Sequence, residues 1–199
     1  MFEELKQKLE SIDSVLDEES ESDIDLSNFD SSKNYTREEL KKFGRLKYCV
    51  EILKKSGGES KYLMIEVIVQ KNDEKYSKTY LRGFDFRYGS HHLMIYEFMK
   101  EELGKRLSSK FVFPDRWPKM RDSRDDALLH SLTLENSDEK ITISALGGGK
   151  FDLKNKSINL SGSSQAFGSI PRAYEDRFKE LMQQLVQKPV YQGFRINYS

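Results

Sequence analysis

The chain of 199 residues has one cysteine, three histidines and no long apolar run. A single cysteine, Cys49, excludes an internal disulfide bond and a metal site built on cysteines, and it fits a reducing compartment. The first segment, MFEELKQKLE, is not a basic stretch followed by an apolar one, so the sequence indicates neither a secretory signal nor a membrane span. We therefore expect a cytoplasmic protein that consists of one ordinary domain with appendages.

Acidic residues gather near the N-terminus although the formal net charge is zero. Residues 1–33 carry eleven Asp or Glu and three Lys, a balance of −8, so the remaining residues sum to +8. This asymmetry indicates an acidic tail on a mildly basic domain, which would suit an anionic substrate. The plainer alternative is that the dispersed lysines only solvate the surface.

The first 59 residues predict two helices joined by an acidic linker. Apolar residues recur at helical spacing in MFEELKQKLESIDSVL, which predicts an amphipathic helix that needs a surface to lie on, such as a protein partner. The acidic, serine-rich segment that follows cannot bury enough apolar surface to become ordered. A capping box at TREE, residues 36–39, then begins a second predicted helix that ends near residue 55. We divide this extension into an amphipathic helix with a disordered linker, residues 1–35, and a helical extension, residues 36–59.

Residues 60–199 predict one α+β domain, in which helices pack against a mixed β-sheet. KYLMIEVIVQ and YSKTYLRGF predict a β-hairpin, and apolar spacing predicts a helix over 90–107. Two prolines interrupt residues 108–129, which we interpret as an inserted loop. HSLTLEN, KITISALGGGKFDL and KSINLSG predict further strands, PRAYEDRFKELMQQLVQ a helix that begins at Pro171, and PVYQGFRINY a closing strand.

Two of the histidines, His91 and His92, stand side by side at the predicted start of the 90–107 helix. The positive field at a helix N-terminus favours neutral imidazole, the form that a nucleophile or general base requires. The alternative is structural, with one ring packed against the sheet and the other solvated. Neither the histidines nor the acids show metal-ligand spacing such as H-E-x-x-H, so we expect no metal and no cofactor.

Two further segments could supply parts of an anion site. LGGGK, residues 146–150, lies at a strand end, where glycines allow a ligand or another backbone to approach and Lys150 would add a point charge; a bulge or turn is the alternative. In SGSSQAFG, residues 161–168, backbone N–H groups and the Ser164 hydroxyl can hold a phosphate, or the loop can simply connect a strand to a helix. A basic imidazole, a glycine-rich strand end and an N–H-rich loop together favour phosphoryl transfer.

Several segments, in order along the chain, resemble those of the Janus/Ocnus family, to which the phosphohistidine phosphatases belong. They are KYLMIEV, YLRGF, HHLMIYE, ALGGGKFD and KSINLSGSSQAFG, followed by a helix and an aromatic closing strand. The resemblance covers about residues 60–198, and LGGGK followed by G-x-S-x-A-F-G is its most specific part. It implies a metal-independent protein phosphatase that hydrolyses the P–N bond of phosphohistidine and, to some degree, of phospholysine.

The resemblance also implies roles for individual residues. His92 matches the catalytic histidine of the family, as nucleophile or as general base. The implied phosphate-binding residues are Lys61, Lys150, Ser164, Gln165 and Ala166. Lys150 stands where the phosphatases have arginine, so a point charge replaces a bidentate fork.

Several departures from the family pattern leave a second class of function open. Met94 replaces a usual acidic residue, His91 stands where the family usually has tyrosine, and residues 1–59 and 108–129 have no counterpart. The alternative is a catalytically inactive member that acts as a phospho-binding or scaffold module in a larger assembly. For the enzyme, the expected partners are phosphohistidine-containing proteins, and we expect no nucleic acid.

Overall fold

The structure is a computed structural model of the whole chain, and its secondary-structure elements follow the predicted order. The described residues are 2–15, 59–85, 103–104, 107, 111, 131–136, 138–164, 167–188, 191 and 193–198. The elements are α1 (Phe2–Glu10), β1 (Glu59–Lys71), β2 (Glu74–Asp85), β3 (Ser131–Asn136), β4 (Glu139–Lys154), β5 (Ser157–Ser161), α7 (Glu175–Gln187) and β6 (Arg195–Tyr198). The expected helix over 37–55, most of the helix over 90–107 and nearly all of the 108–129 loop lie outside the described residues.

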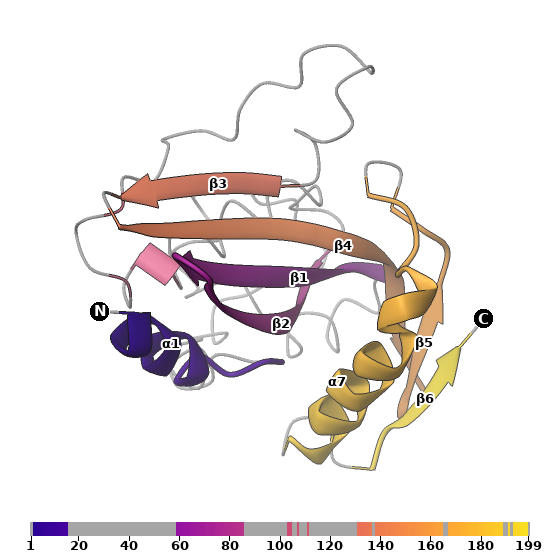
Figure 1. Cartoon of the computed structure of the whole chain (residues 1–199). Helices are drawn as coiled ribbons and strands as arrows, with labels where there is room; N and C mark the ends of the chain where they lie inside the picture. Colours follow the sequence, from indigo (N-terminus) through magenta and orange to yellow (C-terminus); the bar gives the residue numbers. More distant parts are fainter. Residues whose placement is uncertain are drawn as a thin grey trace, which may run out of the picture.

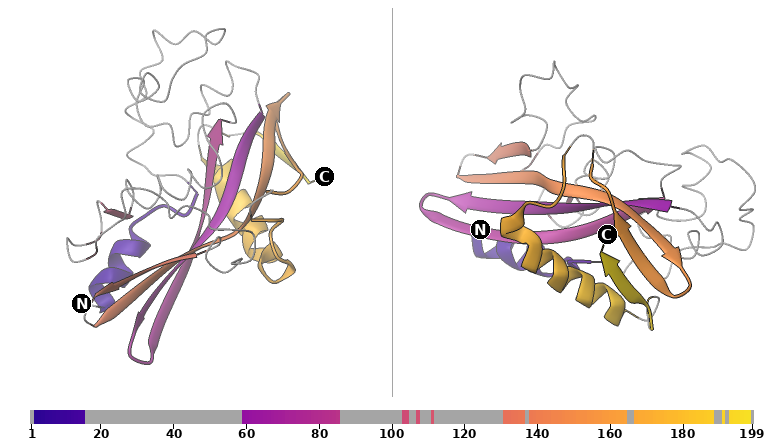
Figure 2. Two further views of the ribbon diagram at one scale, coloured as in Figure 1. Left: turned by 90° about the horizontal axis from the view of Figure 1, so that it is seen from above. Right: turned by 90° about the vertical axis from the view of Figure 1, so that its right-hand side faces the viewer.

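The strands form one six-stranded mixed sheet, which confirms the predicted α+β class (Figure 1). Its order is β2-β1-β4-β5-β6, and β3 pairs with the first part of β4. The predicted hairpin is present as the antiparallel pair β1 and β2, and β6 runs parallel to β5. Because β4 is 16 residues long, it pairs with β1 along one edge and with β3 and then β5 along the other. The sheet is strongly twisted, and β5 and β6 curl away from the plane of β1 and β2 (Figure 2).

Strand alternation gives the sheet two apolar faces, each covered by a different helix (Figure 2). We call them the α1 face and the α7 face. The α1 face carries Leu63, Ile65, Val67 and Val69 of β1, which cluster with Phe2, Leu5, Leu9 and Ile12. The α7 face carries Tyr62 and Met64 of β1, which cluster with Phe178, Leu181, Met182 and Leu185. The surface that the N-terminal helix needs is therefore supplied by the chain's own sheet.

The C-terminal end of α1 is capped by a lysine of β2. The last carbonyl groups of a helix have no partner within it, and the Lys78 amine donates hydrogen bonds to the carbonyl oxygens of Leu9, Glu10 and Ile12 at 3.1, 3.0 and 2.7 Å. The Tyr80 hydroxyl also donates to the Leu9 carbonyl, at 2.8 Å. Burial lowers the pKa of Lys78. The cap fixes the position at which α1 ends against the sheet.

After α1 the chain runs along the outer edge of β2. The Leu81 amide donates to the Ser14 carbonyl at 2.7 Å, and the Arg82 guanidinium donates to the carbonyls of Ser14 and Asp13 at 3.0 and 2.7 Å. Asp13 forms an ion pair with Lys188, which follows α7 on the other face. Residues 11–15 thus cross from one face to the other and satisfy part of the backbone at the outer edge of β2.

The C-terminal elements differ from the prediction in their bounds. A 3₁₀ turn over Arg172–Tyr174 precedes α7, so the regular helix begins four residues after Pro171. The closing strand is shorter than predicted and comprises only Arg195–Tyr198. Residues 191–194 form a turn instead, in which the Phe194 amide donates a hydrogen bond to the Tyr191 carbonyl and Gly193 has a φ of +81°. In the described part of the chain, no helix is both long and apolar enough to span a membrane.

Candidate anion-binding site

Two of the expected phosphate-binding residues, Lys61 and Lys150, are direct partners in the antiparallel pairing of β1 with β4. Both lie on the α1 face, since Lys61 is two residues from Leu63 on β1. Side chains that are directly opposite each other have Cβ atoms about 5 Å apart, and like charges in this arrangement are destabilising. Lys61 is half-buried and Lys150 is exposed. An anion bound to both amines would offset their repulsion, so the arrangement favours anion binding.

Ser161 extends this pair into a row across three strands. The pairing of β4 with β5 places it directly opposite Lys150, on the side away from Lys61. Sequence reasoning missed Ser161, although the polar turn KNK at residues 154–156, between two predicted strands, is a hairpin signal. Asn155 and Lys156 have φ values of 53° and 55°, which are typical of a two-residue type I′ hairpin turn. In such a hairpin, residues equally far from the turn are opposite each other, so counting back from it pairs Lys150 with Ser161.

The loop after β5 binds to the segment of β4 that lies between the β3 and β5 pairings. The Gly148 carbonyl accepts a hydrogen bond from the Ser164 amide at 2.8 Å, and the Gly148 amide donates to the Gly168 carbonyl at 3.1 Å. Ser164 and Gly168 also exchange two backbone hydrogen bonds, of 3.1 and 2.8 Å, which close the loop at its base. The structure therefore brings Ser164 beside the strand segment that leads directly to Lys150.

The Ser164 side chain organises this loop from within. It is only 3% exposed, and its hydroxyl oxygen accepts a hydrogen bond from the Phe167 amide at 3.1 Å. This bond holds residues 164 and 167 together across the tip of the loop. The Phe167 ring anchors the loop in the α1-face core, a role that the sequence analysis did not find. Gln165 and Ala166, between these two residues, lie outside the described part of the chain.

Two glycines of LGGGK allow the loop backbone to approach β4. A Cβ atom on Gly147 would lie 2.4 Å from the Ser169 carbonyl oxygen, and its φ of +147° also disfavours a side chain. A Cβ atom on Gly149 would lie 2.8 Å from the Ser161 carbonyl oxygen. The structure thus shows close approach of another backbone at these two glycines. It also shows the bulge, because Met64 of β1 is opposite Gly147 and Ile65 is opposite Ala145, so Leu146 has no partner on β1.

The histidine pair, His91 and His92, lies outside the described residues. Three residues near the end of the predicted 90–107 helix are described, and two of them are leucines. Leu103 and Leu107 are buried in the α1-face core, and the Leu107 amide donates to the Leu103 carbonyl at 2.7 Å, as in one turn of α-helix. The C-terminal end of this segment therefore packs on the face that carries the lysine row, and the position of His92 stays a prediction.

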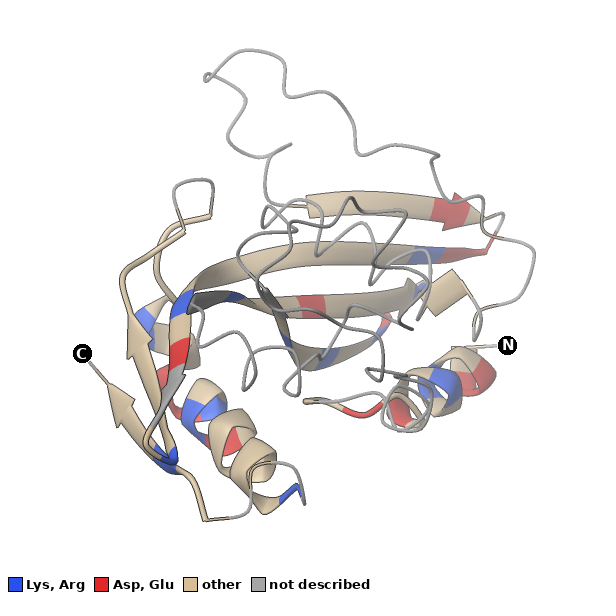
Figure 3. Cartoon of the chain, turned by 180° about the vertical axis from the view of Figure 1, so that it is seen from behind, with Lys and Arg blue, Asp and Glu red and all other residues tan. Residues whose placement is uncertain are grey.

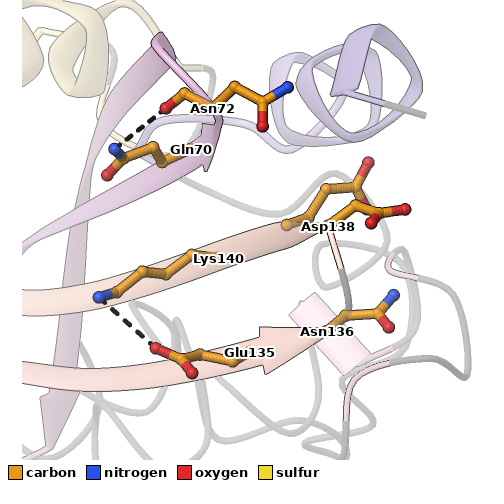
Figure 4. Close-up of a pocket in the computed structure, with 7 residues that line it drawn as sticks. Gln70, Asn72, Glu135, Asn136, Asp138 and Lys140 are labelled. Atoms are coloured by element: carbon orange, nitrogen blue, oxygen red, sulfur yellow. Dashed lines mark hydrogen bonds and ion pairs between the residues drawn. The ribbon is translucent and has the colours of Figure 1, made fainter.

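A cavity of about 260 Å³ opens at the opposite end of the sheet (Figure 4). It is lined by Gln70, Asn72, Glu135, Asn136, Asp138, Glu139 and Lys140. Three carboxylates against one amine would repel an anion, and the Lys140 amine already lies 3.5 Å from the Glu135 carboxylate. Along β1, Gln70 is about 30 Å from Lys61 at the usual rise per residue. We therefore do not include this cavity in the anion site.

Elsewhere along the described ribbon, basic and acidic positions are interspersed (Figure 3). Lys8 pairs with Glu4 on α1 at 2.6 Å, and Arg177 pairs with Glu180 on α7 at 2.8 Å. Among the residues that the structure describes, no group of His, Cys, Asp and Glu side chains is arranged to hold a metal ion.

Residues 46–189 match the family model of the Janus/Ocnus family (Ocnus). The matched segment begins before β1 and extends just past the end of α7, so it contains the lysine row, the 161–168 loop and the histidine pair. It does not include α1. A search of the curated proteins finds no match to the chain.

Proposed function

Since the chain belongs to the Janus/Ocnus family, we propose that it is a metal-independent protein phosphohistidine phosphatase with His92 as its catalytic residue. The observation that carries the proposal is the row of Lys61, Lys150 and Ser161 beside the loop that Ser164 closes. This row supplies positive charge and hydroxyl groups at one end of the α1 face. We further propose a cytoplasmic setting, which fits a chain with a single cysteine.

In this proposal the described residues bind and orient the phosphoryl group. The amines of Lys61 and Lys150 neutralise its oxygens, and the Ser164 hydroxyl donates a hydrogen bond from the base of the loop. We assign the backbone N–H groups of Gln165 and Ala166 to the same cradle. Donors that are fixed in place before the substrate binds stabilise developing charge without reorganising, which is the main source of catalysis when the leaving group is already good.

The chemistry that remains is transfer of the phosphoryl group to water. The substrate P–N bond breaks, the imidazole nitrogen that leaves takes up a proton, and water supplies the fourth oxygen of inorganic phosphate. Two routes satisfy this balance. His92 attacks phosphorus and forms a phosphohistidine on the enzyme that water then hydrolyses, or His92 accepts a proton from a water molecule that attacks in line.

The proposal is tested by phosphate release from a phosphohistidine peptide in the presence and absence of a chelator. We expect turnover by the pure protein at the same rate in both conditions. No turnover in either condition would contradict the proposed enzyme, and binding of the phosphopeptide without turnover would point to the phospho-binding module instead. Turnover that the chelator abolishes would contradict the metal-independent mechanism.

A further inference from the structure

The α1 face continues beyond the lysine row with a second row of polar residues. Asp152 of β4 is paired with Asn159 of β5, and Asn159 is paired with Asn197 of β6. Asp152 is two residues from Lys150, so strand alternation places both side chains on the same face. Asp152 and Asn159 are half-buried, and Asn197 is exposed. The α1 face therefore ends in a polar platform of two adjacent rows.

The second row is both ordered and chemically versatile. The Asn197 side-chain amide donates a hydrogen bond to the Asn159 side-chain oxygen at 2.7 Å, which holds the two amides against each other. Amide groups both donate and accept hydrogen bonds, so this pair suits the backbone of a peptide. Asp152 adds a carboxylate from β4, and the pairing of β1 with β4 places Glu59 directly opposite it, so the row is acidic on this side.

The spacing of the rows fits a peptide substrate. Two residues along a strand span about 7 Å, so the Asp152 position is about that far from Lys150. In an extended peptide, the same distance separates a residue from the second residue on either side of it. A peptide whose phosphorylated side chain is bound by the first row thus places a flanking residue over the second row.

The charge of Asp152 indicates which type of flanking residue the peptide carries. A carboxylate so close to a phosphate-binding row opposes the binding of an anion, unless the ligand also brings a positive charge. We propose that Asp152, supported by the pair of Asn159 and Asn197, selects phosphorylated peptides with Lys or Arg about two positions from the phosphorylated residue. The proposal rests on the proposed function, because it takes the lysine row as the phosphate site.

The test is equilibrium binding of peptides that carry a stable triazole phosphonate analogue of phosphohistidine, measured by fluorescence anisotropy. The peptides differ only in having Arg or Ala at the second position before or after the analogue. Because an exposed ion pair contributes little free energy, we expect wild type to bind one Arg peptide about two- to fivefold more tightly than the Ala peptide. Asp152→Asn should abolish this preference. Asp138→Asn, which alters an exposed carboxylate at the opposite end of the sheet, should retain it.

Each outcome decides between the proposals. Equal binding of the Arg and Ala peptides by wild type overturns the role of Asp152, and so does a preference that survives in Asp152→Asn. The protein could also show a preference for Arg that depends on Asp152 but release no phosphate from phosphohistidine. This result would overturn the proposed phosphatase activity and retain the proposed selective binding surface. Failure of wild type to bind any of the analogues overturns both proposals.

Discussion

At the scale of single residues, Lys61 and Lys150 place two positive charges at one point of the sheet. Their side chains are directly opposite on paired strands, where opposite charges stabilise a sheet and like charges destabilise it. Local arrangements that disfavour the fold in this way occur mainly at functional sites. Arginine at position 150 would give the two-pronged contact of the family pattern, whereas the lysine gives a point charge.

This arrangement predicts that Lys150→Ala weakens binding without unfolding the protein. Replacement of the exposed Lys150 should change the free energy of unfolding by less than about 0.5 kcal/mol. It should also raise the KM for a phosphohistidine peptide by roughly tenfold or more with little change in kcat, because the amine meets the phosphate in both the ground state and the transition state. Chemical denaturation and steady-state kinetics measure the two effects.

The matched control is Lys140→Ala on the same strand, where the lysine is paired with Glu135 at the far end of the sheet. It should leave KM unchanged. Lys61→Ala should resemble Lys150→Ala, and Lys150→Arg should keep or improve affinity. A fall in kcat at constant KM in the alanine variants would contradict a binding role for these lysines.

At the scale of elements, α1 belongs to the core of the fold, although its sequence predicts only a helix in need of a surface. Its apolar side chains lie among those of β1, β2, β3 and β4, and its C-terminal end is capped by Lys78. The sequence of α1 alone does not predict this packing, because the contacts join residues about 70 positions apart. The family match does not include α1, so its role here is to cover the sheet and part of the β2 edge.

Packing of α1 in the core predicts that Leu9→Ala destabilises the whole protein. Leu9 is 0% exposed, and truncation of a buried leucine costs about 2–5 kcal/mol. Gln7→Ala, at an exposed position of the same helix, should change the free energy of unfolding by less than about 0.5 kcal/mol. Thermal or chemical unfolding followed by circular dichroism measures both. Equal small effects would show that α1 does not contribute to the cooperative core.

At the scale of the whole molecule, the sequence predicted the order of strands and helices and the α+β class, since alternation and turn residues are local signals. Contacts across the β4–β5 hairpin could be counted from its turn, as Ser161 illustrates. The pairing of Lys61 with Lys150 could not be predicted from the sequence, because β1 and β4 are far apart in sequence. In addition, a bulge shifts their register between Met64 and Ile65. The loop that contains Ser164 can pack against β4 because Gly147 and Gly149 have no side chains there. This is a tertiary contact, and the glycine motif alone does not predict it.

The roles of His91 and His92 came from the family resemblance and from helix geometry. Neighbouring positions on a helix point about 100° apart, so only one of the two side chains can face the lysine row. From the apolar stripe of this predicted helix, we expect His92 on the side that faces the sheet and His91 at its rim. We therefore predict different effects for two adjacent residues of the same type.

Single-turnover dephosphorylation of a phosphohistidine peptide by His92→Ala, His91→Ala and wild type tests the central claim most directly, with folding checked by circular dichroism. We predict that His92→Ala slows the reaction by several orders of magnitude, as loss of a nucleophile or base does. His91→Ala should slow it by less than about tenfold, a small change in activation free energy. Equal losses in the two variants would contradict the assignment of His92, and a fully active His92→Ala would contradict the proposed mechanism itself.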